Sequence, residues 1–177
     1  MFLRTNSGML NLDHVVLVQI NQKFMRPRDD GYKLKAITTN ICESNRQPYN
    51  SRKEYEAPKP AEISPYSVQI AEGTLKDCEN VFGKIAERDN FIKITENEYS
   101  SLLNLKHIIS VDINPSPNGQ NDSLKIIVNT FHSDKNLQNI SEGCHFPILS
   151  PYELRLSNDN GHNCKEIIEA IEKFGIL

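Results

Sequence analysis

The cysteine and histidine side chains of this sequence are its first candidates for a functional site, because they could bind a metal ion. The sequence holds four cysteines and five histidines, and thiolate and imidazole groups are the ligands that zinc prefers. No CxxC motif occurs, and no two of the candidates are spaced like a known pair of zinc ligands. We therefore expect no bound metal and no other cofactor, with buried thiols and surface imidazoles instead. The zinc site set aside in this way would consist of Cys144, His145, His162, Cys164 and His132.

Two further histidines, His14 and His107, occupy equivalent places in two similar segments of the sequence. One hypothesis is a paired acid–base or ligand site, because imidazole titrates near neutral pH. The other is structural: each histidine follows Leu-Asn-Leu and precedes an apolar run, where its ring nitrogens would bond to local backbone. We favour the structural hypothesis.

The motifs of common catalytic sites are absent from the sequence. Its eight glycines are scattered singly, so no phosphate-binding loop is present. The sequence also lacks a GxSxG nucleophile motif and an HExxH metal motif. We expect a protein that is not an enzyme.

A mixture of aromatic and basic side chains in residues 43–60 is the best candidate for contact with a partner. Proteins that bind single-stranded nucleic acids use such mixtures. Glutamates in the same segment offset most of its charge, and the whole chain has 20 basic against 23 acidic residues, a net charge of −3. No strongly basic face is therefore expected. The candidate partner-binding residues are Arg26, Arg28, Arg46, Tyr49, Arg52, Lys53 and Tyr55.

Composition places the chain among folded globular proteins. It has 177 residues, of which 38% are hydrophobic and 24% charged, and this length can bury a core without disulfide staples. No apolar run approaches the roughly 18 residues of a membrane span. The first residues lack the layout of a secretion signal, and the cysteines are spaced irregularly. We expect a cytoplasmic protein in a reducing compartment, with no membrane partner.

The sequence repeats itself in two separate blocks. Residues 10–21 match residues 103–114 without a gap, and both segments run from Leu-Asn-Leu through a histidine into a β-branched stretch. Residues 64–70 match residues 150–156, and both begin with Ser-Pro-Tyr. Because the blocks follow in the same order, they indicate an internal duplication.

The duplication divides the chain into two β-rich repeats, at residues 1–89 and 90–177. Each repeat is expected to form about five strands followed by one helix. The alternation and β-branched content of the first repeat predict these strands: Phe2–Thr5, Met9–Leu12, Val15–Ile20, Tyr32–Thr39 and a last one containing Tyr66, Val68 and Ile70. Val15–Ile20 is apolar enough to be buried on both faces, and Tyr66 is expected to pack on the core.

The two expected helices carry similar apolar stripes. In the first repeat Thr74 is the expected cap, and Asp77 completes a capping box. In the second repeat Asn160 is the expected cap. Apolar residues spaced at three and four positions predict one buried face on each helix: Cys78, Val81, Phe82 and Ile85 on the first, and Cys164, Ile167, Ile168, Ile171 and Phe174 on the second.

Strands followed by a helix, rather than alternating with helices, predict an antiparallel α+β fold. In its order of elements each half resembles a pleckstrin-homology-like domain, a small bent sheet closed by a C-terminal helix. We expect a non-enzymatic protein–protein interaction or adaptor module, with loops presented on a repeated scaffold. A nucleic-acid-associated protein is the alternative, and an enzyme with its site between the repeats is less favoured. The expected partner is a protein; nucleic acid and a homo-oligomer remain open.

Overall fold

The computed structural model describes residues 2–5, 8–22, 31–44, 62–96, 99–114, 123–133, 149–158 and 161–175. The described elements run in the same order twice along the chain. The first series is β1 (Phe2–Thr5), β2 (Gly8–Asn11), a 3-10 turn η1 (Leu12–His14), β3 (Val15–Gln22), β4 (Tyr32–Ser44), β5 (Glu62–Gly73) and α1 (Leu75–Ala86). The second series is β6 (Phe91–Glu96), β7 (Tyr99–Asn104), η2 (Leu105–His107), β8 (Ile108–Asn114), β9 (Ser123–Ser133), β10 (Leu149–Ser157) and α3 (Cys164–Phe174).

The largest sheet combines strands from both series. Its order is β5-β4-β3-β7-β6, so the β6–β7 hairpin of the second series adds onto β3 of the first. Leu17 lies opposite Leu103 and Val18 opposite Leu102 in this antiparallel pairing. Residues 89 and 90 lie in the turn between α1 and β6, and the five-stranded sheet therefore crosses the expected boundary between the repeats.

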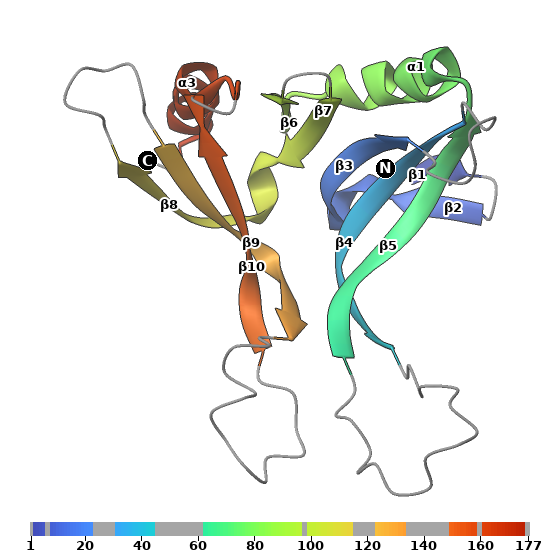
Figure 1. Cartoon of the computed structure of the whole chain (residues 1–177), viewed down its shortest axis with the longest axis horizontal. Helices are drawn as coiled ribbons and strands as arrows, with labels where there is room; N and C mark the ends of the chain where they lie inside the picture. Colours follow the sequence, from blue (N-terminus) through green and yellow to red (C-terminus); the bar gives the residue numbers. More distant parts are fainter. Residues whose placement is uncertain are drawn as a thin grey trace, which may run out of the picture.

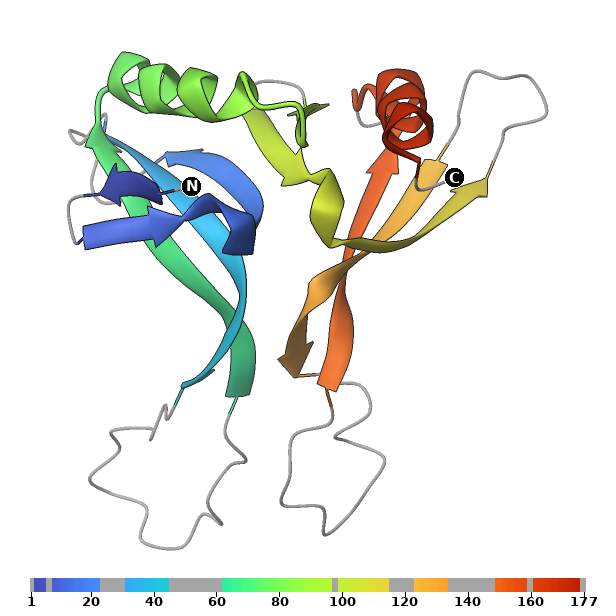
Figure 2. The same ribbon diagram turned by 180° about the vertical axis from the view of Figure 1, so that it is seen from behind.

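Two smaller sheets complete the β-structure of the described residues. One has the order β10-β9-β8, and the other is the β1–β2 hairpin. Helix α1 lies above the five-stranded sheet and α3 above the three-stranded sheet (Figures 1 and 2). All described strand pairs are antiparallel, so the expected α+β class is confirmed. Neither described helix is long and apolar enough to cross a membrane.

Strand β3 contributes to two hydrophobic cores, because it is buried on both faces. Val18 and Ile20 belong to the core beneath α1, which also contains Leu102. Val16 and Leu17 belong to the core beneath α3. The pairing of β3 with β4 shifts register between Val15 and Leu17, and such a bulge redirects side chains to the other face. The prediction that Val15–Ile20 is buried on both faces is confirmed.

The start of α1 forms as the sequence predicts. The backbone N–H of Asp77 donates to the Thr74 hydroxyl over 3.2 Å, and the Thr74 N–H donates to the Asp77 carboxylate over 3.0 Å. These two bonds are the expected capping box. The Thr74 hydroxyl and N–H both donate to the carboxylate, and they lower the pKa of Asp77 below its ordinary value.

The expected cap of the second helix is wrong. Helix α3 begins at Cys164, its capping position is Asn163, and Asn160 lies outside the described residues. The Asn163 side chain makes no capping bond; it bonds to β6 and also donates to the Glu166 carboxylate over 2.8 Å. Its oxygen accepts from the Thr95 N–H over 2.9 Å, and its amide donates to the Lys93 carbonyl over 3.0 Å.

Most residues of the two helical stripes are buried, as expected. Cys78, Phe82 and Ile85 are buried on α1, whereas Phe174, expected in the stripe of α3, is exposed. The expectation for Phe174 is wrong: it is the last residue of α3, and the buried stripe stops one turn earlier, at Ile171. Tyr66, also expected to pack on the core, is exposed as well.

Candidate functional site: an open strand edge and a pocket between the halves

The residues singled out by the sequence as partner contacts are not among those that the structure describes. All seven, Arg26, Arg28, Arg46, Tyr49, Arg52, Lys53 and Tyr55, lie outside the described residues. Cys144 and His145, two of the zinc candidates, lie outside them as well. Within the described ranges no three metal-ligating side chains gather.

The remaining zinc candidates take part in local packing. Cys164 is buried at the start of α3, and the buried His162 ring places Nδ1 2.9 Å from the Ser157 carbonyl oxygen. His132 stands edge-on to the ring of Tyr152, with 6.0 Å between the ring centroids. These contacts hold the strands and the helix of the second half together.

The two equivalent histidines differ in their surroundings. The Nε2 atom of His107 lies 2.8 Å from the carbonyl oxygen of Asp13. Because a carbonyl oxygen only accepts, this nitrogen carries the hydrogen. The bond joins η2 to η1 and so links the two halves, whereas His14 is exposed. Burial lowers the pKa of His107, and the bond to Asp13 opposes that effect.

The first component of the candidate site is the outer edge of β8, which sequence reasoning missed. Strand β8 repeats the β-branched pattern of β3, yet within the described residues it has a neighbour only on the β9 side. Ile109 is 55% exposed and Ile113 37%, whereas their counterparts in β3, Val16 and Ile20, are 1% and 8% exposed. A strand edge with exposed apolar side chains is a template for pairing with another strand.

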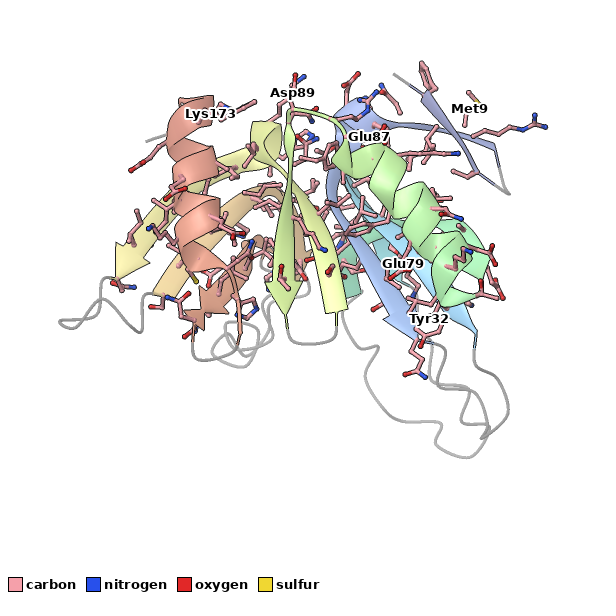
Figure 3. The ribbon with its side chains drawn as sticks, turned by 90° about the horizontal axis from the view of Figure 1, so that it is seen from above. Met9, Tyr32, Glu79, Glu87, Asp89 and Lys173 are labelled. Carbon is pink, nitrogen blue, oxygen red and sulfur yellow. The ribbon has the colours of Figure 1, made fainter. Side chains whose placement is uncertain are left out.

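The second component is the β1–β2 hairpin, the counterpart of β6–β7. Its inner residues Leu3 and Leu10 pack on the core beneath α1. Its outer residues Phe2 and Met9 are 60% and 64% exposed. Figure 3 shows Met9 at one end of the molecule and α3, marked by Lys173, at the other.

In the β6–β7 hairpin the corresponding positions are filled and covered. Phe91 takes the place of Phe2 opposite an asparagine, and Leu102 takes the place of Met9. Phe91 is 7% exposed and Leu102 is fully buried, and both belong to the core beneath α1, that is, the core of the preceding half. A hairpin of this type therefore buries its outer face against the half that comes before it.

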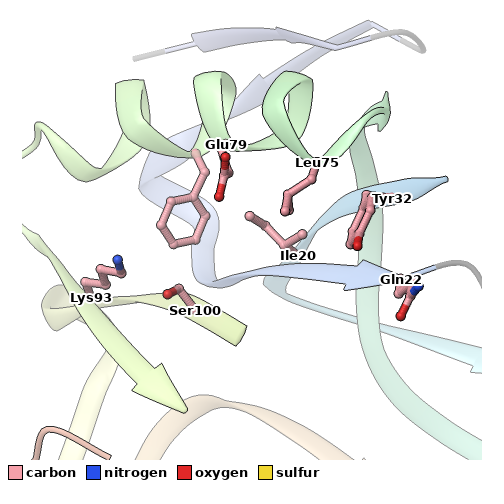
Figure 4. Close-up of a pocket in the computed structure, with 8 residues that line it drawn as sticks. Ile20, Gln22, Tyr32, Leu75, Glu79, Lys93 and Ser100 are labelled. Atoms are coloured by element: carbon pink, nitrogen blue, oxygen red, sulfur yellow. The ribbon is translucent and has the colours of Figure 1, made fainter. Parts of the chain in front are cut away.

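The third component is a pocket of about 570 Å³ between α1 and the five-stranded sheet (Figure 4). Both halves contribute to it, because Lys93 and Ser100 come from the β6–β7 hairpin and Tyr32 and Glu79 from the first half. Its apolar wall consists of Ile20, Leu75 and Phe82, and Gln22 completes the lining. One ammonium, one carboxylate and several neutral donors around an apolar wall suit an amphipathic ligand.

The comparisons with known proteins give no relative for the chain. No protein-family model, no curated protein and no solved structure matches the chain. The candidate site is therefore defined by geometry alone: the open edge of β8, the exposed side of the β1–β2 hairpin and the pocket between the halves.

Proposed function

We propose that the protein is a non-enzymatic protein-binding module that takes an extended segment of its partner onto the outer edge of β8. The observation that carries this proposal is the pair Ile109 and Ile113, which are exposed on a strand whose counterpart is buried on both faces. Strand addition supplies affinity through backbone hydrogen bonds and specificity through alternate side chains. The β7 strand, seated on β3, is a template for the geometry.

We further propose that residues 1–89 and 90–177 are tandem copies of one unit. Three features support this proposal. Element order repeats; β3 and β8 bulge at matching places, after Val15 and Ile108; and Asn11 and Asn104 accept the same bond from the backbone two residues on. The pleckstrin-homology-like description of each half rests on the same order of elements, strands followed by one helix.

A second candidate function is the binding of a small amphipathic ligand in the pocket between the halves. The observation that favours it is the contrast between the apolar wall and the polar groups of Glu79 and Lys93 that line the same pocket. A Ser100→Trp variant would fill the pocket, whereas binding at β8 would be untouched. Loss of a bound ligand from this variant alone, seen by native mass spectrometry, would support this function.

Affinity capture from the native host tests the proposed site at β8. The wild-type chain, an Ile109→Lys/Ile113→Lys double variant and an Ile41→Lys control serve as baits, since Ile41 is similarly exposed on a different strand. We expect the partner to be retained by the control and lost by the double variant, with no effect of nuclease. Equal capture by all three baits would refute the β8 site, and loss on nuclease treatment would favour a nucleic-acid partner.

A further inference from the structure

We infer that the edge of β8 is occupied by the β1–β2 hairpin of a second copy of this chain, so that copies assemble head to tail. This inference rests on the proposed binding site at β8 and names its occupant. The structure already contains this contact once, because the β6–β7 hairpin of the second half adds onto β3 of the first. The same chain also carries a second hairpin and a second acceptor strand, each without a strand neighbour of this kind within the described residues.

The internal contact fixes the register of the contact between copies. Within the chain Leu17 lies opposite Leu103, and Val18 opposite Leu102. The sequence match of residues 10–21 with 103–114 transfers these pairs to the open edge. Ser110 of one copy then faces Leu10 of the next, and Val111 faces Met9.

The exposed side chains fall where the internal contact buries its own. Leu102 and Phe91 pack with Val18 and Ile20 beneath α1. In the assembly Met9 and Phe2 of the second copy would meet Val111 and Ile113 beneath α3. Val111 already packs against the core of that half, and Ile113 is exposed beside it. Each apolar residue exposed on the hairpin thus meets an apolar residue on the edge: Val111, which is half-buried, or Ile113, which is exposed.

Helix α3, which lies above the open edge, also carries an exposed apolar side chain. Phe174 is exposed at the end of α3, and α3 lies above the sheet to which β8 belongs (Figures 1 and 2). Within the chain, α1 passes through a turn into β6, which places Phe91 beneath α1. In the assembly, Phe2 of the second copy would take that place beneath α3, beside Phe174.

The two partners of the contact lie at opposite ends of the molecule (Figure 3). The interface is therefore heterologous, with a different surface on each copy. Such contacts generate closed rings or open filaments, whereas an isologous dimer uses the same surface twice. The chemistry of the occupant is that of an antiparallel β-hairpin with a large apolar residue on each strand.

Light scattering coupled to size-exclusion chromatography tests this assembly over a range of concentrations. We expect the wild-type chain to run at two or more times its mass of 20.2 kDa. Met9→Glu and Ile113→Lys place a charge on the hairpin and on the edge respectively, and each alone should reduce the mass to that of one chain. Ile41→Lys, a matched exposed position on β4, should leave the assembly intact.

Mixing the two single variants separates a head-to-tail contact from any other. The mixture contains an unaltered hairpin on one chain and an unaltered edge on the other, so we expect it to form a dimer and nothing larger. A symmetric interface would not be complemented in this way. Circular dichroism checks that each variant is folded. The inference would be overturned if the wild-type chain is a monomer at all concentrations, or if the mixture of the two variants remains monomeric.

Cysteine cross-linking tests the register without relying on charged variants. Met9→Cys on one copy and Val111→Cys on another should form a mixed disulfide, whereas Met9→Cys with Asp112→Cys, one residue out of register, should not. Equal cross-linking of both pairs would refute the register. If the wild-type chain does not assemble but the double variant at β8 still loses a captured partner, the proposed function stands and only its occupant changes.

Discussion

Strands β3 and β8 carry nearly the same sequence pattern and end in opposite environments. Both follow Leu-Asn-Leu and a histidine, and both pair with the next strand through a bulge at the same place. Strand β3 has a neighbour on each side and is buried on both faces, whereas β8 lies at the edge of its sheet. The burial of such a strand depends on whether a hairpin is added to its outer side, a long-range choice that local sequence does not contain.

The largest expected effect separates these two strands directly. Ile20→Ala should lower the free energy of unfolding by about 2–5 kcal/mol, because it opens a cavity in the core beneath α1. Ile113→Ala, the same change at the counterpart position, should cost less than about 1 kcal/mol, because the side chain is already exposed. Urea denaturation, at a protein concentration where the chain is monomeric, measures the loss of stability in both variants.

Equal costs for the two variants would show that the edge of β8 is covered within a single chain. That outcome would contradict both the comparison of the strands and the site proposed on it. A stability loss at Ile113 that grows with protein concentration would instead point to burial of this side chain between copies.

The next largest expected loss of stability concerns Asn104, which links the β6–β7 hairpin to β3. The buried Asn104 amide donates to the Val15 carbonyl over 2.8 Å, and its oxygen accepts from Asn90 and from the Lys106 N–H. Asn104→Ala leaves these groups without their partner, a loss of about 1–3 kcal/mol. Asn11→Ala, at the half-buried counterpart, is the control and should cost less. Thermal unfolding that ranks the two variants in the opposite order would contradict this account.

Local features of the fold were predictable because short-range chemistry decides them. The capping box joins Thr74 and Asp77, which are only three residues apart in the chain, and it formed as predicted. The strands lie within a few residues of their expected bounds; β4 and β5 are longer than expected, and β5 begins at Glu62. The stripe of α1 is buried at the spacing that helical periodicity requires.

The sheet that crosses the two halves was not predictable in the same way. Nothing in the sequence of β3 says that β7, rather than another strand, lies beside it, because β8 offers the same pattern. The candidate site on β8 follows from that choice, whereas the residues proposed from composition, such as Arg46 and Tyr49, lie outside the described residues. The sequence does not mark Met9 and Ile113 as exposed residues. Their exposure indicates a binding site only by comparison with their counterparts Leu102 and Ile20, which are buried.

A smaller effect distinguishes the starts of the two helices. Thr74→Ala removes the side-chain cap of α1 and should cost about 1 kcal/mol. Asn163→Ala removes no cap, because Asn163 bonds to the backbone of Lys93 and Thr95 at the outer edge of β6. We expect faster hydrogen exchange of the Thr95 amide in the Asn163 variant and no such change in the Thr74 variant. Unchanged exchange at Thr95 in both would show that Asn163 does not protect this edge.

The smallest expected effect is a pH dependence of stability that arises from His107. Burial lowers the pKa of His107 below its ordinary value of 6.5, with smaller contributions of the same sign from the nearby His14 and Lys106. The unfolded chain therefore binds a proton at His107 at a higher pH than the folded chain does. The free energy of unfolding should fall as pH decreases below about 6.5, and this loss should be complete below the lowered pKa of the folded state.

His107→Gln should remove this part of the pH dependence, as measured by urea midpoints between pH 7 and pH 5 (about the range in which imidazole titrates). His14→Gln, at the exposed counterpart, should keep the dependence on pH, because the burial of the His107 ring, which lowers its pKa, is unchanged. The opposite result, with the dependence lost only in the His14 variant, would mean that burial of the His107 ring is not the cause of the pH dependence.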